Sequence, residues 1–138
     1  MNGHRGFTLM ELVIVVAMVA ILASIALPSY EAYVLRAHRA EAMRRLNEVA
    51  LAQERHYTAC NRFAAALAGD PQACTGLGIA DLDVSDGSYV LSMDLANGGF
   101  VLRATPQGTQ VHDTACGELS IDDLGSTGAS GSQAASCW

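Results

Sequence analysis

Apolar residues follow one another almost without interruption near the start of the chain. Residues 7–27 (FTLMELVIVVAMVAILASIAL) are apolar except for Thr8, Glu11 and Ser24. As a helix rising about 1.5 Å per residue, this run would extend roughly 30 Å, which matches the hydrocarbon core of a bilayer. The pattern therefore predicts a transmembrane helix over residues 7–28.

A secretory signal peptide is the competing interpretation of this run. Such a signal has a basic start, a short apolar core and an A-x-A-like cleavage site after the core. The run here is longer, and its fifth residue is a carboxylate, Glu11. We therefore expect the run to be retained in the mature chain.

Residues 29–57 predict a continuation of the same helix. The segment after Pro28 is rich in Ala, Glu, Arg and Leu and contains no Gly, so we expect a helix that passes through a proline bend. Residues recurring at intervals of three and four predict a stripe that docks on the rest of the chain. This stripe consists of Ala42, Leu46, Val49, Ala50, Gln53 and Tyr57.

Arginines on this helix predict a solvated face. Glu41 stands one turn before Arg44 and Arg45, a spacing that stabilises an exposed helix by roughly a few tenths of a kcal/mol. Together with Arg36 and Arg39 these arginines are interpreted as solvent-exposed, and a specific phosphate or lipid contact is the alternative.

Beyond Cys60 the chain becomes rich in Gly, Asp and Ser, and a period of two replaces the helical period. Alternation predicts one strand over residues 88–95 and a second that includes residues 100–104. The segment Asn97-Gly98-Gly99 between them tolerates positive φ and predicts a hairpin turn. The alternating apolar residues are Tyr89, Leu91, Met93 and Leu95, and then Phe100, Leu102 and Ala104.

A third strand is expected over residues 118–122, with Leu119 and Ile121 facing inward and a turn at residues 123–125. The 138-residue chain leaves only about 80 residues for a soluble body, which is enough for one core. One long helix against a small antiparallel sheet is an α+β fold.

The charge balance argues against nucleic acid as a partner. The formal net charge is -6, and the sequence contains no Lys. Beyond Thr58, the sequence has nine acidic residues and only two basic ones, Arg62 and Arg103. Such a surface repels phosphate backbones, so we do not expect nucleic-acid binding.

Four cysteines follow the apolar run, and none of them has C-x-x-C spacing, which favours two disulfides in an oxidising compartment over a zinc site. Three pairings are possible. We choose Cys60 with Cys74 and Cys116 with Cys137, because each bond then closes a loop within its own region. Each bond would contribute roughly 3 kcal/mol. The second bond would close the Gly/Ser-rich tail into a surface loop and hold Trp138 against the body.

The remaining candidate motifs indicate neither a catalytic site nor a metal site. The histidines His4, His38, His56 and His112 are scattered, so we expect surface or interface histidines and no metal site. No nucleophile elbow, phosphate-binding loop or acid/base carboxylate pair is present, and the acids at positions 122–123 fit a turn. We expect neither an enzyme nor a cofactor.

Glu11 is the most informative single residue. A carboxylate inside a bilayer costs about 3 kcal/mol or more and usually has a partner, yet the apolar run contains no Arg or Lys. The nearby helix N-terminus favours a negative charge. Cleavage after Gly6 would create an amine on Phe7, and the amine of a neighbouring subunit is one candidate partner. A Glu that reaches water at the headgroups is the alternative.

The segment GFTLMELVIVVAMVAILASIALPSY, residues 6–30, resembles the N-terminal signature of type IV pilins and pseudopilins. A polar leader ends in Gly and is followed by Phe, a Thr-Leu pair, a Glu at the fifth mature position, an apolar span and a Pro. Met10 replaces the more usual Ile or Leu, a volume-conserving change.

This resemblance implies processing and assembly. Prepilin peptidase would cut between Gly6 and Phe7 and methylate the Phe7 amine, and Glu11 would guide docking onto other pilins through their N-terminal helices. Pro28 marks the position where the helix is expected to loosen during extraction from the membrane. The other implied partners are membrane lipid before assembly and the inner-membrane pilus assembly machinery.

The segment 104–138 is similar to the C-terminal block of minor pilins related to PilE, in which two cysteines bracket the D-region. We therefore divide the chain into a leader (1–6), a transmembrane or filament-core helix (7–28), an amphipathic helix (29–57) and a globular head (58–138). The head includes the disulfide-bounded region 116–137. Residues 61–87 show no recognisable pattern.

The expected function is that of a type IV pilus subunit, more a minor than a major pilin, serving motility, attachment or DNA uptake. It would be held in the bacterial inner membrane with its head in the periplasm and would then join an extracellular pilus. The alternatives are a type II secretion pseudopilin and a single-pass anchor carrying a binding module. A DNA-receptor pilin of a competence system is a further alternative, which the acid-rich head argues against.

Overall fold

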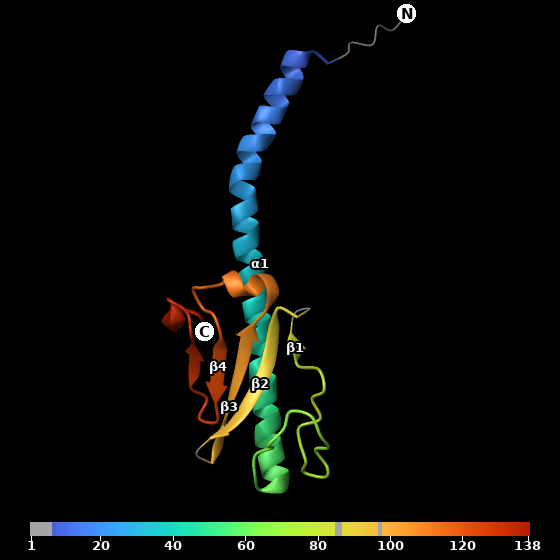
Figure 1. Cartoon of the computed structure of the whole chain (residues 1–138), viewed down its shortest axis with the longest axis vertical. Coiled ribbons are helices and arrows are strands. Elements are labelled where there is room, and N and C mark those ends of the chain that lie inside the picture. The colour runs from blue at the N-terminus through green and yellow to red at the C-terminus, as the bar shows by residue number, and fades with distance from the viewer. Residues whose placement is uncertain (1–6, 85–86, 97) are drawn as a thin grey trace, which may run out of the picture. The chain divides into compact units, whose positions relative to one another are not determined.

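The computed structural model describes residues 7–84, 87–96 and 98–138 (Figure 1). The chain divides into two units, one ending at Val34 and the other comprising Leu35–Trp138, which we call the head. Gly6, the expected cleavage position, lies outside the described residues, as does Asn97 of the expected hairpin turn.

The first element is one helix, α1 (Leu9–Cys60), of 52 residues. It is continuous through position 28, as the sequence predicts, and it ends three residues later than expected. Asn61 stops it by adopting a left-handed φ of 53° while its N–H donates to the carbonyl of Tyr57 at 2.8 Å. Asn is one of the few residues that tolerate this conformation after a helix.

The head contains a five-stranded antiparallel sheet in the order β1-β2-β3-β4-β5. The strands are β1 (Asp83–Val84), β2 (Tyr89–Ala96), β3 (Gly99–Pro106), β4 (Leu119–Asp122) and β5 (Thr127–Ala129). The three predicted strands correspond to β2, β3 and β4. The edge strands β1 and β5 were not predicted, because two or three residues are too few to show a period of two.

The turns follow the expected chemistry. Gly98 has a φ of 83° between β2 and β3. After β4, the Asp122 carboxylate accepts the N–H groups of Leu124 at 3.0 Å and Ser126 at 2.7 Å, and Gly125 has a φ of 75°. The acids at positions 122–123 therefore serve a turn, as predicted.

The core lies between the sheet and one face of α1 in the head (Figure 1). The strand residues predicted to face inward are buried in β3 and β4, and in β2 they are buried at its first half, whereas Leu95 is 50% exposed. The helix contributes Ala42, Leu46, Val49 and Gln53, each at most 1% exposed.

The predicted stripe on α1 is wrong at its last position. Tyr57 is 43% exposed, whereas His56 is only 5% exposed. Positions 56 and 57 lie on opposite sides of the buried face below Gln53, and the Phe63 ring beside Tyr57 leaves it partly exposed, whereas the chain after α1 covers the side of position 56. There the carbonyl of Arg62 lies 3.0 Å from the His56 ring.

A short 3-10 helix, η1 (Gly108–His112), lies between β3 and β4, and another, η2 (Ala134–Ser136), follows β5. The structure joins Cys60 to Cys74 and Cys116 to Cys137, the pairs chosen from the sequence. Within the second loop, Gly131 approaches the chain so closely that an added Cβ would lie 2.3 Å from the carbonyl oxygen of Ala115.

Candidate functional site

The start of α1 places Glu11 at a defined position. The Thr8 hydroxyl accepts the backbone N–H of Glu11 at 3.2 Å, which caps the first turn. Thr-x-x-Glu is the spacing of a capping box, a signal that the sequence analysis passed over. Glu11 therefore stands in the first turn, where the helix dipole stabilises a negative charge.

The described part of the first unit offers Glu11 no cationic partner. This part, residues 7–34, contains no Arg, Lys or His. Nearly all of its apolar side chains are exposed, including Phe7 at 82%. Within α1, an 18-residue window with a mean hydropathy of 2.7 has none of its residues buried, so the helix is long and apolar enough to cross a membrane.

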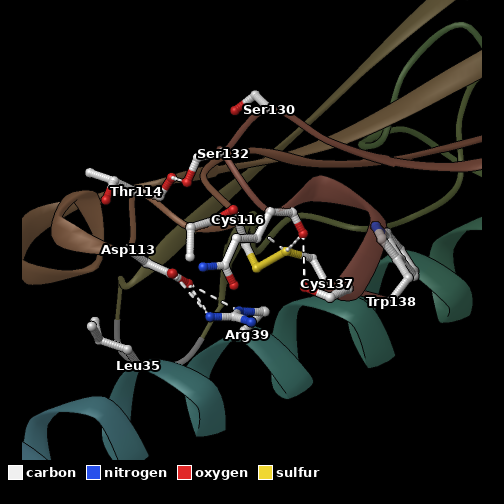
Figure 2. Close-up of a disulfide and its surroundings, with 12 residues drawn as sticks. Leu35, Arg39, Asp113, Thr114, Cys116, Ser130, Ser132, Cys137 and Trp138 are labelled. Atoms are coloured by element: carbon white, nitrogen blue, oxygen red, sulfur yellow. Dashed lines mark hydrogen bonds and ion pairs between the residues drawn. A yellow bond between two sulfur atoms is a disulfide. The ribbon is translucent and has the colours of Figure 1, made fainter.

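Arg39 connects α1 to the C-terminal half of the head. Its Nε and Nη2 atoms donate to the two carboxylate oxygens of Asp113, both at 3.0 Å (Figure 2). The Arg39 side chain is 16% exposed and that of Asp113 is 4% exposed. The prediction of a solvated arginine face is therefore wrong for Arg39, because sequence spacing along the helix cannot reveal an acid 74 residues away.

Gln110 extends this ion pair into a buried polar network. Its side-chain amide donates to the Leu35 carbonyl at 3.2 Å, to the Tyr89 hydroxyl at 3.0 Å and to Asp113 at 3.3 Å. Burial raises the pKa of the Tyr89 phenol, and the hydrogen bond from Gln110 partly opposes that rise. The network links η1 to both α1 and β2.

A disulfide joins the two ends of the C-terminal region, residues 116–137. The Cys116–Cys137 disulfide is almost fully buried, with exposures of 1% and 3% (Figure 2). Trp138 follows it, donates its indole N–H to the Gly128 carbonyl at 2.8 Å and remains 36% exposed. The Gly/Ser-rich tail is therefore ordered by one covalent bond and by pairing of β5 with β4.

Most arginines of the head are engaged. Arg103 forms ion pairs with Asp94 and Glu118. On α1, Arg44 pairs with Glu41 and Glu48, whereas Arg45 reaches Glu48 and not Glu41. The hydrogen bond from Arg44 lowers the pKa of the Glu41 carboxyl.

Two cations near the end of α1 have no carboxylate partner among the described residues of the head. Arg55 is exposed and forms no ion pair with the described residues. Arg62 is exposed and donates to the Cys74 carbonyl at 3.1 Å. Arg62 also lines an open cavity of about 700 Å³ together with Tyr57 and Phe63, whose rings lie 4.7 Å apart.

The histidines differ from the expectation of surface positions. His112 is exposed and His38 is half-buried, with a 2.9 Å hydrogen bond to Ser88. His56 is buried, so the surface prediction is wrong for it. Its ring lies beside Cys60 and Cys74, and the interval of four residues between His56 and Cys60 is the signal that could have revealed this neighbourhood. His4 lies outside the described residues.

Two family models together match residues 1–120 of the chain. A model described as "Prokaryotic N-terminal methylation motif" matches residues 1–27. A second, described as "Type IV minor pilin ComP, DNA uptake sequence receptor", matches residues 28–120.

Known proteins with similar sequences include fimbrial proteins and major type IV pilins. A fimbrial protein of Neisseria meningitidis serogroup A is 36% identical over 110 residues, which cover 80% of this chain and 59% of that protein. The type IV major pilin protein PilE of Neisseria gonorrhoeae is 35% identical over 79% of this chain and 60% of its own length. The chain thus covers less than two thirds of the length of these relatives.

A solved type IV pilin from Shewanella oneidensis has a similar structure. Its TM-score is 0.52 at 28% sequence identity, and the match covers 75% of this chain and 97% of that one. The similarity agrees with the predicted arrangement of a long N-terminal helix and a small antiparallel sheet.

Replacing Asp113 with Ala should lower the free energy of unfolding by about 3 kcal/mol, because it leaves the largely buried Arg39 guanidinium without its carboxylate and removes one acceptor of Gln110. Unfolding of the full chain in detergent micelles can be followed by the fluorescence of Trp138. Asp94→Ala is the matched control, because this acid also pairs with an arginine but is 69% exposed, so its loss should cost less than about 1 kcal/mol. Equal losses for both variants would contradict the structural role of the buried pair.

Proposed function

The chain belongs to the type IV pilins, in the family of the minor pilin ComP, and we propose that it is a minor pilin whose N-terminal helix is processed and packed into a filament. The observation that carries this proposal is the first turn of α1. There a capped Glu11, which has no cationic partner among residues 7–34, begins an exposed apolar helix. The family consists of structural pilins.

Before assembly, α1 would hold the subunit in the bacterial inner membrane with its head in the periplasm. The apolar window of α1 has the length and hydropathy for this role. The two disulfides of the head favour the oxidising side of the membrane. The subunit would then enter an extracellular pilus with the help of the inner-membrane assembly machinery.

Assembly would pair Glu11 with the Phe7 amine of a neighbouring subunit. Removal of the leader after Gly6 creates this amine, and methylation leaves it positively charged. A carboxylate in an apolar filament core needs such a partner, because its burial alone is costly. Packing the exposed apolar side chains of α1 against other helices replaces lipid with protein. Pro28 lacks a backbone N–H, so the helix would loosen most easily around it.

The pseudopilin of type II secretion and the uncleaved single-pass anchor are less well supported. The minor-pilin model matches residues 28–120, and a disulfide-closed C-terminal region ends the head. The methylation-motif match argues against an uncleaved anchor.

DNA uptake is a second candidate function, favoured by the description of the matching family. The acidic head does not favour contact with DNA over most of its surface. The end of α1 is the exception. Arg55 and Arg62 are exposed there without a carboxylate partner in the part of the chain that the structure describes, and Tyr57 offers a partly exposed ring. Arginine with an aromatic ring suits phosphate contact and base stacking.

Processing predicts a defined mass. The protein extracted from membranes of a host with prepilin peptidase should begin at N-methylated Phe7 and be lighter by four hydrogens, one pair for each disulfide. Gly6→Val should leave the leader attached, because a bulkier side chain would block the cut. Intact-mass and N-terminal analysis of the non-reduced wild-type and Gly6→Val proteins measures the cleavage, the methylation and the disulfides. A wild-type chain that still carries Met1 would contradict the processing step.

Glu11→Ala should leave a processed, membrane-bound subunit that reaches sheared filaments at least tenfold less often than wild type, because the Phe7 amine of the next subunit loses its partner. Quantitative immunoblotting of sheared and membrane fractions gives the ratio. Glu31→Ala, which removes an exposed carboxylate from the same helix beyond the apolar run, should assemble normally. Wild-type incorporation of the Glu11→Ala subunit would refute the docking role.

Arg55→Ala and Arg62→Ala should each weaken DNA binding by the full chain and reduce the slope of log affinity against log salt by about one unit. Fluorescence anisotropy with labelled duplex DNA at several salt concentrations measures this effect. Arg103→Ala is the control, because its guanidinium already pairs with two carboxylates. If the wild type does not bind at low salt, the DNA-receptor role is wrong and the filament role stands unaffected.

A further inference from the structure

A nitrogen and two sulfur atoms meet at the C-terminal end of α1. Nε2 or Nδ1 of His56 and the Sγ atoms of Cys60 and Cys74 all lie within 4.8 Å of one another. His56 and Cys60 are four residues apart and therefore share one face of the helix. Cys74 arrives from the loop after α1 and is joined to Cys60 by the disulfide.

The hydrogen bonding of His56 determines which ring nitrogen is available. Nδ1 lies 3.0 Å from the backbone carbonyl of Arg62, and a carbonyl can only accept, so Nδ1 carries the proton. Nε2 then has a free lone pair. This atom is buried and has no hydrogen-bond partner among the described residues, within a side chain that is only 5% exposed.

This is the arrangement of a histidine that binds a metal. Ligating histidines almost always donate their second ring N–H to a carbonyl or carboxylate, which orients the ring and leaves the other nitrogen basic. Buried polar atoms ordinarily have a partner. Because Nε2 has no partner among the described residues of the oxidised chain, this nitrogen is available to bind a ligand.

We propose that reduction of the Cys60–Cys74 disulfide creates a binding site for a thiophilic d10 cation, Zn²⁺ or Cu⁺. The ligands are Nε2 of His56 and the two cysteine thiolates. A dithiol supplies the two electrons and two protons, so that its own thiols become a disulfide while Cys60 and Cys74 become thiols. The cation then displaces both thiol protons, and neutral His56 binds without releasing one.

The donor set selects the class of metal. One imidazole and two thiolates are soft ligands that suit zinc and copper(I) and do not suit magnesium or calcium. Three protein ligands complete a trigonal Cu⁺ site, and they leave Zn²⁺ one further position. A cavity of about 250 Å³ lined by His56 and by Arg55, Ala59 and Pro71 adjoins the cluster and can hold a water molecule there.

The surroundings allow the sulfur atoms to separate. A bound metal at about 2.3 Å from each sulfur requires them to lie farther apart than in a disulfide. Cys74 lies in a connection that has no helix or strand between Asn61 and Leu82. Both cysteines of this bond are partly exposed, whereas those of the Cys116–Cys137 bond are buried, so a dithiol reaches the first bond more easily.

The test uses the full chain in detergent micelles, either oxidised or treated with dithiothreitol and freed of it without oxygen. Alkylation and peptide mapping identify which cysteines are reduced. Zn²⁺ and Cu⁺ are titrated separately against chromophoric chelators, and bound metal is counted by elemental mass spectrometry. We expect one ion per reduced chain, none per oxidised chain, and two protons released per ion.

The decisive comparison is between histidine variants. His56→Ala should lower the affinity of the reduced chain at least tenfold, and His56→Cys should restore it by supplying a third thiolate. His38→Ala is the matched control, because His38 lies on the same helix and bonds to Ser88, far along the chain from both cysteines. Cobalt(II) gives a second readout, since its thiolate-to-metal absorption reports coordination by sulfur.

Three results would overturn the proposal. Equal metal content in oxidised and reduced chains would show adventitious binding. Wild-type affinity in His56→Ala would show a thiol pair acting alone, and failure of the reduced wild type to bind either cation would remove the site. None of these outcomes bears on filament assembly, which Glu11 tests separately.

Discussion

The burial of one face of α1 beneath the sheet is the constraint on which the head depends. A 52-residue helix has no stable interior of its own, so its order in the head comes from the apolar face that it shares with the strands. Ala42, Leu46 and Val49 fill this contact and are at most 1% exposed. The rest of the same helix keeps its apolar side chains exposed, which leaves them available to lipid or to other helices.

Polar contacts make this packing specific. A purely apolar interface would tolerate a shift of the helix along the sheet, whereas the bidentate contact between Arg39 and Asp113 permits one register. Gln110 adds bonds to the Leu35 carbonyl and to Tyr89, so that η1, β2 and α1 hold one another in place. Among the described residues, the side-chain oxygen of Gln110 is the one buried atom of this network without a hydrogen-bond partner, and the bonds of the other groups limit the cost of burying them.

The two disulfides lie in different surroundings and have different structural roles. Cys116–Cys137 is buried under a Gly/Ser-rich tail that has little apolar surface of its own, so the covalent bond replaces packing. Cys60–Cys74 closes the loop after α1 beside the buried His56 imidazole, whose Nε2 has no hydrogen-bond partner among the residues that the structure describes. The order of the C-terminal tail thus depends on the Cys116–Cys137 disulfide. The Cys60–Cys74 disulfide instead lies beside His56, a side chain that can bind a metal.

The sequence by itself determined the long helix, the strands β2, β3 and β4 and the turn at residues 123–125. These features depend on local periodicity and on residues such as Gly98 that act over a few positions. It also pointed to the family, because the signature around Phe7 and Glu11 is contiguous. Only the tertiary structure decided the partners of Arg39, the burial of His56 in place of Tyr57 and the edge strands β1 and β5. Those outcomes depend on contacts between residues far apart in the chain, which no local pattern encodes.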